Sequence, residues 1–309
     1  LLGGESGVGK SRLLDEVRTQ ALVKGMLLLR GQAVSSGSAA YQVFFDVLRM
    51  LCLEVELTEF EASVLNAVVP NLASLLQQKV ADAPELNAHA TQARFLNVIE
   101  AVFARLQRPT AVILEELHWV GPETIALLER LGQRAGQLRL VLLGSFRDDE
   151  AKDLPKRLPE MNLLPLQRLS PERIAALSES MLGDVGNSPR LVEFLVNQTE
   201  GNAFFIVEVI RALAEEAGQL SDIGQRTLPA RLLVGGIRQV VSRRLNRVPE
   251  WARPLLRLAA VMGRQLDTRA LGLIFPKLDS LLDACADAAV LDISDAAWRF
   301  AHDKLRESL

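Results

Sequence analysis

Residues 4–11 read Gly-Glu-Ser-Gly-Val-Gly-Lys-Ser, a full match to the pattern Gly-x-x-x-x-Gly-Lys-Ser/Thr. Glycines at these spacings let the backbone turn its N–H groups inward around a chain of phosphates. Lys10 can then reach the β and γ phosphates, and the hydroxyl of Ser11 can ligate Mg²⁺. A helix that begins near Lys10 would also point the positive end of its dipole at the same anion. The motif therefore predicts that the chain binds a nucleoside triphosphate.

The sequence around this loop supports the same interpretation. Leu1 and Leu2 have the apolar character of a strand end, and residues 11–23 follow an amphipathic helical pattern. A strand, a glycine-rich turn and a helix in that order are the context in which such loops bind phosphate. The residues assigned to nucleotide binding in this segment are Gly4, Gly7, Val8, Gly9, Lys10, Ser11 and Arg12.

Length and composition restrict the class of protein. The chain has 309 residues, which is too long for one ordinary domain. A composition of 49% hydrophobic and 24% charged residues is typical of a globular protein. A net charge of −3 argues against the whole chain being a binder of polyanions. Cys52 and Cys285 lie in apolar surroundings far apart in sequence, so we expect buried free thiols. We therefore expect a cytoplasmic protein without a membrane span or a signal peptide.

The ends of the sequence indicate a fragment. It begins without Met inside the expected first strand, and it stops at Leu309 within a helical pattern. We therefore expect that further domains flank this chain in a longer protein.

Hydrophobic patterns predict a change of architecture along the chain. Four apolar runs at the spacing of an α/β fold suit parallel strands, namely 26–30, 110–114, 139–145 and 163–166. Helical patterns dominate after Pro171, and a turn at 294–295 predicts a β-wing near the end. The expected units are a nucleotide-binding domain (1–168), a helical lid (169–220) and a compact helical domain with that wing (228–309), with a linker at 221–227.

Two acids follow the apolar run 111–114, namely Glu115 and Glu116. A buried strand that ends in two acids is the usual partner of a phosphate-binding loop. We assign the first acid to Mg²⁺, together with Ser11, and the second to polarising the attacking water. Glu115 is one methylene longer than the more usual Asp, and the two glutamates could exchange these roles.

Arg147 follows the next apolar strand and can contact the γ-phosphate, which would distinguish ATP from ADP. The alternative is that it pairs with one of the acids that follow it, in the segment 148–150. The catalytic assignments from the sequence are therefore Glu116, Lys10 and Arg147.

Together these motifs resemble the signal-transduction ATPases with numerous domains, the STAND class of AAA+-like P-loop ATPases, in their bacterial predicted-ATPase branch. Segment 114–119 (Leu-Glu-Glu-Leu-His-Trp) is similar to the family's acid-acid-Leu-His-Trp signature, and 144–150 (Gly-Ser-Phe-Arg-Asp-Asp-Glu) to its Gly-Thr-Tyr-Arg-Asp-Asp-Glu. Segment 200–205 (Glu-Gly-Asn-Ala-Phe-Phe) resembles Glu-Gly-Asn-Pro-Phe-Phe, and 300–303 (Phe-Ala-His-Asp) resembles a Phe-x-His segment.

The resemblance implies a P-loop NTPase sheet with ASCE/AAA+-like strand order, followed by a helical lid and a winged-helix domain. It implies an ATP/ADP switch in which these parts close over one site, with Ala203 beside adenine and His302 at the β-phosphate of ADP. Ala203 stands where the family usually has Pro, which removes a fixed φ. It also implies self-association with ATP bound and effector domains attached outside this chain.

The sequence leaves three functions open. The first is a regulatory ATPase with slow turnover, and the second is a nucleotide-binding scaffold without turnover. The third is a DNA-binding ATPase that uses an arginine-rich run at residues 231–257. No aromatic residues interleave with the arginines between residues 231 and 247, and in the family that the chain resembles the winged helix mostly serves the switch, so the regulatory ATPase is favoured over direct DNA binding. The three histidines and two cysteines have no metal-ligand spacing, so no zinc is expected.

Overall fold

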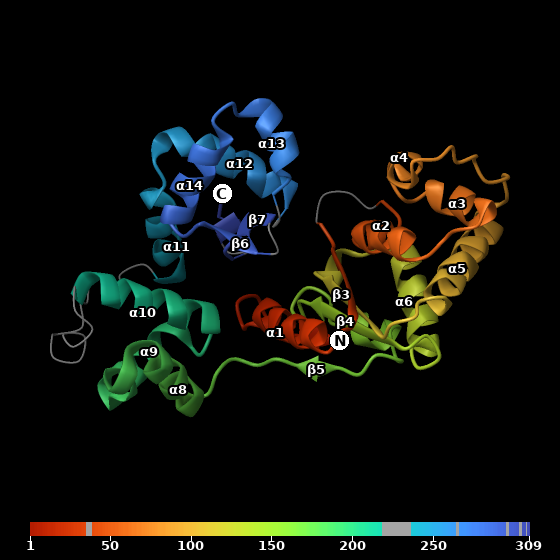
Figure 1. The fold of residues 1–309 in the computed structure, drawn as a ribbon. Coiled ribbons are helices and arrows are strands. Elements are labelled where there is room, and N and C mark those ends of the chain that lie inside the picture. Colours follow the sequence, from red (N-terminus) through yellow and green to blue (C-terminus); the bar gives the residue numbers. More distant parts are fainter. Residues whose placement is uncertain (35–38, 218–235, 264–265, 295–296, 303–304, 307) are drawn as a thin grey trace. The chain divides into compact units, whose positions relative to one another are not determined.

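The computed structural model describes the chain except residues 35–38, 218–235, 264–265, 295–296, 303–304 and 307 (Figure 1). The chain divides into two compact units. The first comprises residues 1–5 and 10–166, and the second comprises residues 6–9 and 167–309.

A parallel five-stranded sheet with the order β2-β3-β4-β1-β5 forms the centre of the first unit. The strands are β1 (Leu2–Gly3), β2 (Leu27–Gln32), β3 (Thr110–Glu115), β4 (Leu140–Phe146) and β5 (Leu164–Pro165). β4 lies between β1 and β3, with Leu2 opposite Ser145. Because parallel strands end at one edge of the sheet, the residues that follow β1, β3 and β4 lie close together.

Helices connect these strands, as expected for a parallel sheet. They are α1 (Lys10–Val23), η1 (Gln42–Phe44), α2 (Phe45–Glu54), α3 (Glu59–Asn66), α4 (Leu72–Leu76), α5 (Ala88–Ala104), η2 (Leu117–Trp119), α6 (Pro122–Arg134) and α7 (Leu154–Arg157). Every residue of β3 is buried, which explains the apolar run 111–114 within it. A separate small cluster joins Leu14 of α1 to Leu2 and Ile113 on one face of the sheet.

The second unit contains mostly helices. They are α8 (Pro171–Leu182), η3 (Gly183–Asn187), α9 (Pro189–Thr199), α10 (Ala203–Ala217), α11 (Gly236–Arg247), η6 (Glu250–Ala252), α12 (Arg253–Met262), α13 (Thr268–Ile274) and α14 (Leu278–Asp287). An antiparallel hairpin of β6 (Leu291–Ser294) and β7 (Ala297–Phe300) follows. Side chains of α8, α9 and α10 share one core, and the later helices pack with the hairpin in another.

The four predicted strands are confirmed as β2, β3, β4 and β5, so the α/β fold with a parallel sheet is confirmed. The segments predicted as helices after Pro171 are helical, and the hairpin lies where a wing was predicted. The expected linker at 221–227 lies outside the described residues. The functions of 169–220 as a lid and of 228–309 as a winged-helix domain stay predictions. Cys52 and Cys285 are buried free thiols, and burial raises the pKa of each, to about 11 and about 12.

Within the described part of the chain, no helix combines the length and the apolar character that crossing a membrane requires.

Gly31 in β2 has no room for a side chain. A Cβ atom there would lie 1.8 Å from the carbonyl oxygen of Val43, a backbone atom that cannot turn aside. We expect Gly31→Ala to reduce the free energy of unfolding by about 1–3 kcal/mol or more, the range for overpacking. Chemical denaturation measures the effect. Gly136→Ala is the matched control, because Gly136 is exposed and a Cβ there meets no atom within 4 Å. Equal stability of the two variants would contradict this packing.

Candidate nucleotide-binding site

Lys10 is the first residue of α1 and is almost fully buried. Its Nζ donates hydrogen bonds to the carbonyl oxygens of Gly4 at 2.6 Å and Glu5 at 2.8 Å. Burial lowers the pKa of the Lys10 ammonium group, and the carboxylate of Glu116 acts in the opposite direction. The loop therefore holds a partly desolvated cation against its own backbone. An anionic ligand is the kind that can compensate such a charge.

The middle of the loop belongs to the second unit. Gly7 and Gly9 have φ values of 89° and 109°, in the left-handed region that favours glycine. Asn202 Nδ2 donates to the carbonyl oxygen of Ser6 at 2.9 Å, and the N–H of Phe204 donates to that of Gly7 at 3.0 Å. The start of α10 therefore holds the turn of the loop through two hydrogen bonds to its backbone.

The predicted metal ligands are adjacent in the first unit. Ser11 lies in the first turn of α1, and Glu115 is the last residue of β3, with its side chain 1% exposed. The Ser11 hydroxyl donates to Glu115 Oε2 at 2.8 Å. A hydroxyl and a carboxylate oxygen are hard donors of the type Mg²⁺ prefers, so these two residues fit that ion.

A third residue, which the sequence analysis missed, completes this group. Arg30 of β2 donates from Nε to Glu115 Oε1 at 3.1 Å and contacts the same oxygen through Nη2. The opposite oxygen of that carboxylate faces Ser11. A single positive charge at the end of an apolar run, in the strand beside the acid-ending strand, is the sequence signal that could have identified Arg30.

Glu116 directly follows β3 in a strained backbone conformation. Its φ and ψ are 60° and 40°, which is uncommon for a residue other than glycine. Its side chain is buried, with Oε2 at 3.4 Å from Arg147 Nε and 3.3 Å from His118 Nε2. Buried charge and backbone strain often coincide at functional sites. The two predicted catalytic residues Glu116 and Arg147 are therefore neighbours.

Arg147 has a second acidic partner. Its Nη1 donates to Glu150 Oε1 at 2.8 Å, and its guanidinium lies over the Trp119 ring at 5.8 Å from the centroid. The alternative that Arg147 pairs with an acid in 148–150 is thus also observed. Contact with both Glu116 and Glu150 was not foreseen.

His118 is a neutral neighbour of these charges. Burial lowers its pKa to about 4, and the charge of Arg147 acts in the same direction. The backbone N–H of Arg147 points at His118 Nδ1 at 3.4 Å. Since Nδ1 accepts, the ring proton is on Nε2, the nitrogen that lies beside Glu116.

The remaining predicted residues have varied surroundings. Val8 is buried, whereas the Arg12 side chain is 84% exposed and lies 4.0 Å from Glu16. Ala203 begins α10 and is half-buried. His302 stacks on the Phe204 ring, with centroids 3.6 Å apart and planes at 21°. His302 therefore contacts Phe204, whose backbone N–H donates to the carbonyl oxygen of Gly7 in the loop.

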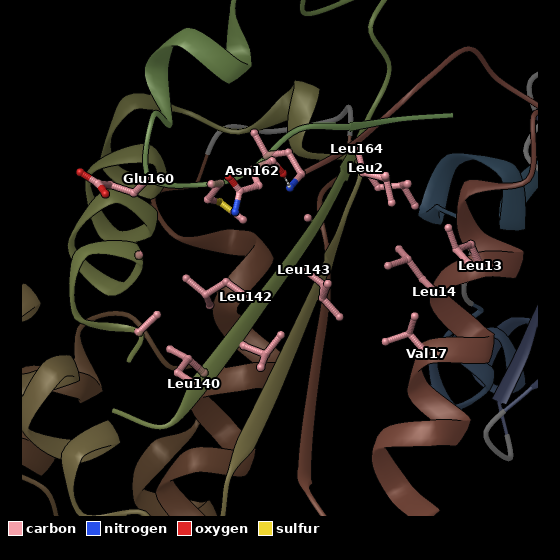
Figure 2. A pocket seen from close by; sticks show the side chains of 16 residues that line it. Leu2, Leu13, Leu14, Val17, Leu140, Leu142, Leu143, Glu160, Asn162 and Leu164 are labelled. Atoms are coloured by element: carbon pink, nitrogen blue, oxygen red, sulfur yellow. Dashed lines mark hydrogen bonds between the residues drawn. The ribbon is translucent and has the colours of Figure 1, made fainter. Parts of the chain in front are cut away.

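An apolar cavity of about 470 Å³ lies elsewhere in the first unit. Figure 2 shows Leu13, Leu14 and Val17 of α1 facing it, together with leucines of β4 such as Leu142 and Leu143. None of the predicted catalytic or metal-binding residues lines this cavity. It is therefore separate from the charged group around Glu115 and Glu116.

Comparison with known proteins finds a family model that matches the N-terminal part of the chain. Residues 1–143 match the family model of the AAA ATPase domain. No curated protein matches the chain. The fold is similar to a STAND protein with a tetratricopeptide repeat sensor from Pyrococcus horikoshii, with a TM-score of 0.58 and 12% identity. That similarity covers 99% of this chain but 39% of the other protein, so the chain spans less than half of that relative.

Two further solved structures give weaker similarity. One is a Walker-type ATPase of Pyrococcus abyssi, with a TM-score of 0.40 and 13% identity over 99% of this chain and 89% of that protein. The other is Cdc6p from Pyrobaculum aerophilum, with a TM-score of 0.43 and 14% identity over 99% of this chain and 85% of that protein. The resemblance to STAND-class P-loop ATPases is thus confirmed by the match of residues 1–143 to the AAA ATPase domain model and by the similarity of the fold to that STAND protein. Residues 1–143, just under half of the chain, are thus similar to the AAA ATPase domain family.

Proposed function

We propose that this chain is the ATP-binding and slowly hydrolysing switch module of a larger signalling or transcription-regulating protein. The observation that carries this proposal is the junction of the loop with β3, where Ser11 bonds Glu115 and Lys10 lies buried against the loop carbonyls. The match of residues 1–143 to the AAA ATPase domain family supports the ATPase assignment.

In this proposal the loop binds the phosphates of ATP. Lys10 exchanges its bonds to Gly4 and Glu5 for bonds to phosphate oxygens, and the N–H groups of the loop turn provide further donors. Ser11 and Glu115 hold Mg²⁺, which supplies charge neutralisation at the phosphates when it is bound.

Glu116 has the position and charge for the water-polarising acid. It is buried, and its partners Arg147 and His118 hold the carboxylate in place. Arg147 lies beside this acid and also pairs with Glu150. A γ-phosphate would compete with Glu116 for the guanidinium of Arg147. We infer that binding of ATP thereby releases the Glu116 carboxylate from its contact with Arg147.

We infer that the second unit provides the switch, with 169–220 as lid and 228–309 as winged-helix domain. The bonds from Asn202 and Phe204 to the loop support this role, and so does the stacking of His302 on Phe204. We assign Ala203 to adenine and His302 to the β-phosphate of ADP. In this proposal the lid and the winged-helix domain close over the site when ADP is bound and open when ATP is bound. The open form would self-associate and regulate effector domains attached outside this chain.

Direct DNA binding is less well supported than the regulatory role. In the arginine-rich run, Arg244 is buried and its Nη1 lies 2.9 Å from Glu208 Oε1, so that charge serves packing between α10 and α11.

Lys10→Ala is expected to weaken binding of Mg²⁺-ATP by roughly ten- to a hundredfold, because charge-assisted hydrogen bonds contribute about 1.5–3 kcal/mol each. Titration calorimetry with ATP measures the change. Lys24→Ala removes an exposed lysine just outside α1 and should bind ATP like the wild type. Equal ATP affinity of Lys10→Ala and the wild type would refute the assignment of the loop.

Glu116→Gln is expected to keep ATP binding and to reduce phosphate release at least a hundredfold, because the amide keeps the shape but is not a base. A coupled phosphate assay under single-turnover conditions gives the rate. Glu85→Gln, at an exposed position, is the control. Unchanged release in Glu116→Gln would assign the catalytic acid elsewhere. Absence of release in the wild type would favour the scaffold without turnover.

The buried neutral His118 predicts a dependence of stability on pH. The pKa of His118 is about 4 in the folded protein and 6.5 ordinarily, so the unfolded chain takes up a proton first as the pH falls. The contribution of His118 to the free energy of unfolding is therefore complete above pH 6.5 and is lost as the pH falls toward 4. Between pH 6.5 and pH 4, we expect the free energy of unfolding of the wild type to fall by about 1–3 kcal/mol more than that of His118→Gln. Urea denaturation at several pH values tests this, with the exposed His89→Gln as control. Parallel pH curves for His118→Gln and the wild type would contradict a neutral buried imidazole.

A further inference from the structure

Arg30 lies on the same face of the sheet as the metal-ligand candidate Glu115. The register pairs Arg30 with Ile113, and Gln32 with Glu115. Residues two apart in a strand point to the same face, so Arg30, Ile113 and Glu115 share one side. Ile113 packs with Leu14 of α1, which identifies this side as the one that α1 covers. Arg30 therefore lies on the α1-covered face of the sheet, on the same side as Glu115.

The two oxygens of Glu115 have different partners. Oε2 accepts the hydroxyl of Ser11 at 2.8 Å, whereas Oε1 accepts from Nε and Nη2 of Arg30. The same guanidinium lies near a second acid, with Nη1 at 3.9 Å from Asp15 Oδ1 on α1. This arrangement holds the carboxylate so that one oxygen faces Ser11 and the other faces a fixed positive charge.

Charge compensation explains why an arginine stands here. The Glu115 side chain is 1% exposed, and a carboxylate so far from water is strongly unfavourable without a partner of opposite charge. The Ser11 hydroxyl is a neutral donor and cannot compensate a full charge. The Arg30 side chain is 30% exposed, so its own charge remains partly solvated while it neutralises Glu115.

We propose that Arg30 is a built-in counter-ion that takes the electrostatic place of the metal on Glu115 when no nucleotide is bound. This inference rests on the proposed role of Glu115 as a Mg²⁺ ligand. A cation already paired with Glu115 repels a second cation at the same carboxylate. Free Mg²⁺ would therefore bind weakly at Glu115, and the negative charge of the ATP phosphates would be needed to hold it there. Arg30 acts through Glu115 and is a positioning residue.

The proposal is tested on the nucleotide-free full chain by thermal unfolding in EDTA and in millimolar MgCl₂. Arg30→Gln should lower the unfolding midpoint in EDTA by about 5 °C, since one partner of a buried pair is removed. Mg²⁺ should restore most of this loss by replacing the missing charge. The wild-type midpoint should be the same in both solutions. Arg49→Gln, at an exposed position on α2, should match the wild type.

A second variant separates charge from packing. The double variant Arg30→Gln with Glu115→Gln removes both charges, so it should be more stable in EDTA than Arg30→Gln alone and should not respond to Mg²⁺. Arg30→Lys keeps the charge and should keep the insensitivity of the wild type to Mg²⁺. This variant also tests the proposal if Arg30→Gln does not fold.

Three results would overturn the proposal. They are an Arg30→Gln midpoint that is equally low with and without Mg²⁺, a double variant no more stable than the single one, and a lysine variant that gains a response to Mg²⁺. Failure of the proposed nucleotide site is detected separately, by ATP binding to Lys10→Ala, because the unfolding experiments contain no nucleotide.

Discussion

The hydrogen bond between Ser11 and Glu115 joins the phosphate-binding loop to the buried strand β3 of the sheet. It connects residues more than a hundred positions apart in sequence, and it exists because β1, β3 and β4 end at one edge. The same parallel order brings Glu116 and Arg147 together. Without that order the loop would be an isolated anion-binding turn with no acid beside it. Strand order is thus the constraint from which the chemistry of the site follows.

Buried charges at this edge occur in opposed pairs. Glu115 is paired with Arg30, and Glu116 lies beside Arg147. Each buried acid therefore has a basic side chain that compensates its charge, which a packed interior requires. A nucleotide with its metal brings both anionic phosphates and a cation, and it can therefore exchange partners with both pairs. Such exchange would provide the physical basis of the switch that we propose, because the ligand would change which groups are paired.

Much of this site follows from local sequence patterns. The loop at residues 4–11 and the acids after β3 identified Lys10, Ser11 and both glutamates, because these motifs lie in short segments with fixed spacing. The continuous apolar runs identified the buried strands for a similar reason. Arg30, by contrast, acquires its role only from the pairing of β2 with β3, and Asn202 acquires its role from a contact nearly two hundred positions away. No local pattern encodes these pairings by itself, and the single positive charge at the end of the apolar run 26–30 becomes informative only once the strand order is known.

The exposed Arg12 illustrates the opposite difficulty, because adjacency to a motif does not determine where a side chain points. Its position on α1 directs it to solvent and toward Glu16. His118 shows that the ionisation state also depends on the fold. The low pKa arises mainly from burial, with smaller effects of charges in the segment after β4 and of Lys10 on α1, and it could not be inferred from the Leu-His-Trp segment alone.

A crystal structure of the chain with Mg²⁺ and a non-hydrolysable ATP analogue tests the central claim most directly. We predict that the triphosphate lies within residues 4–11, with Lys10 Nζ moved from the loop carbonyls to the phosphates. We also predict that Mg²⁺ lies between the Ser11 hydroxyl, Glu115 and the phosphate oxygens. A nucleotide bound away from this loop, or a loop that keeps its Lys10 and Ser11 bonds unchanged in the complex, would contradict the claim.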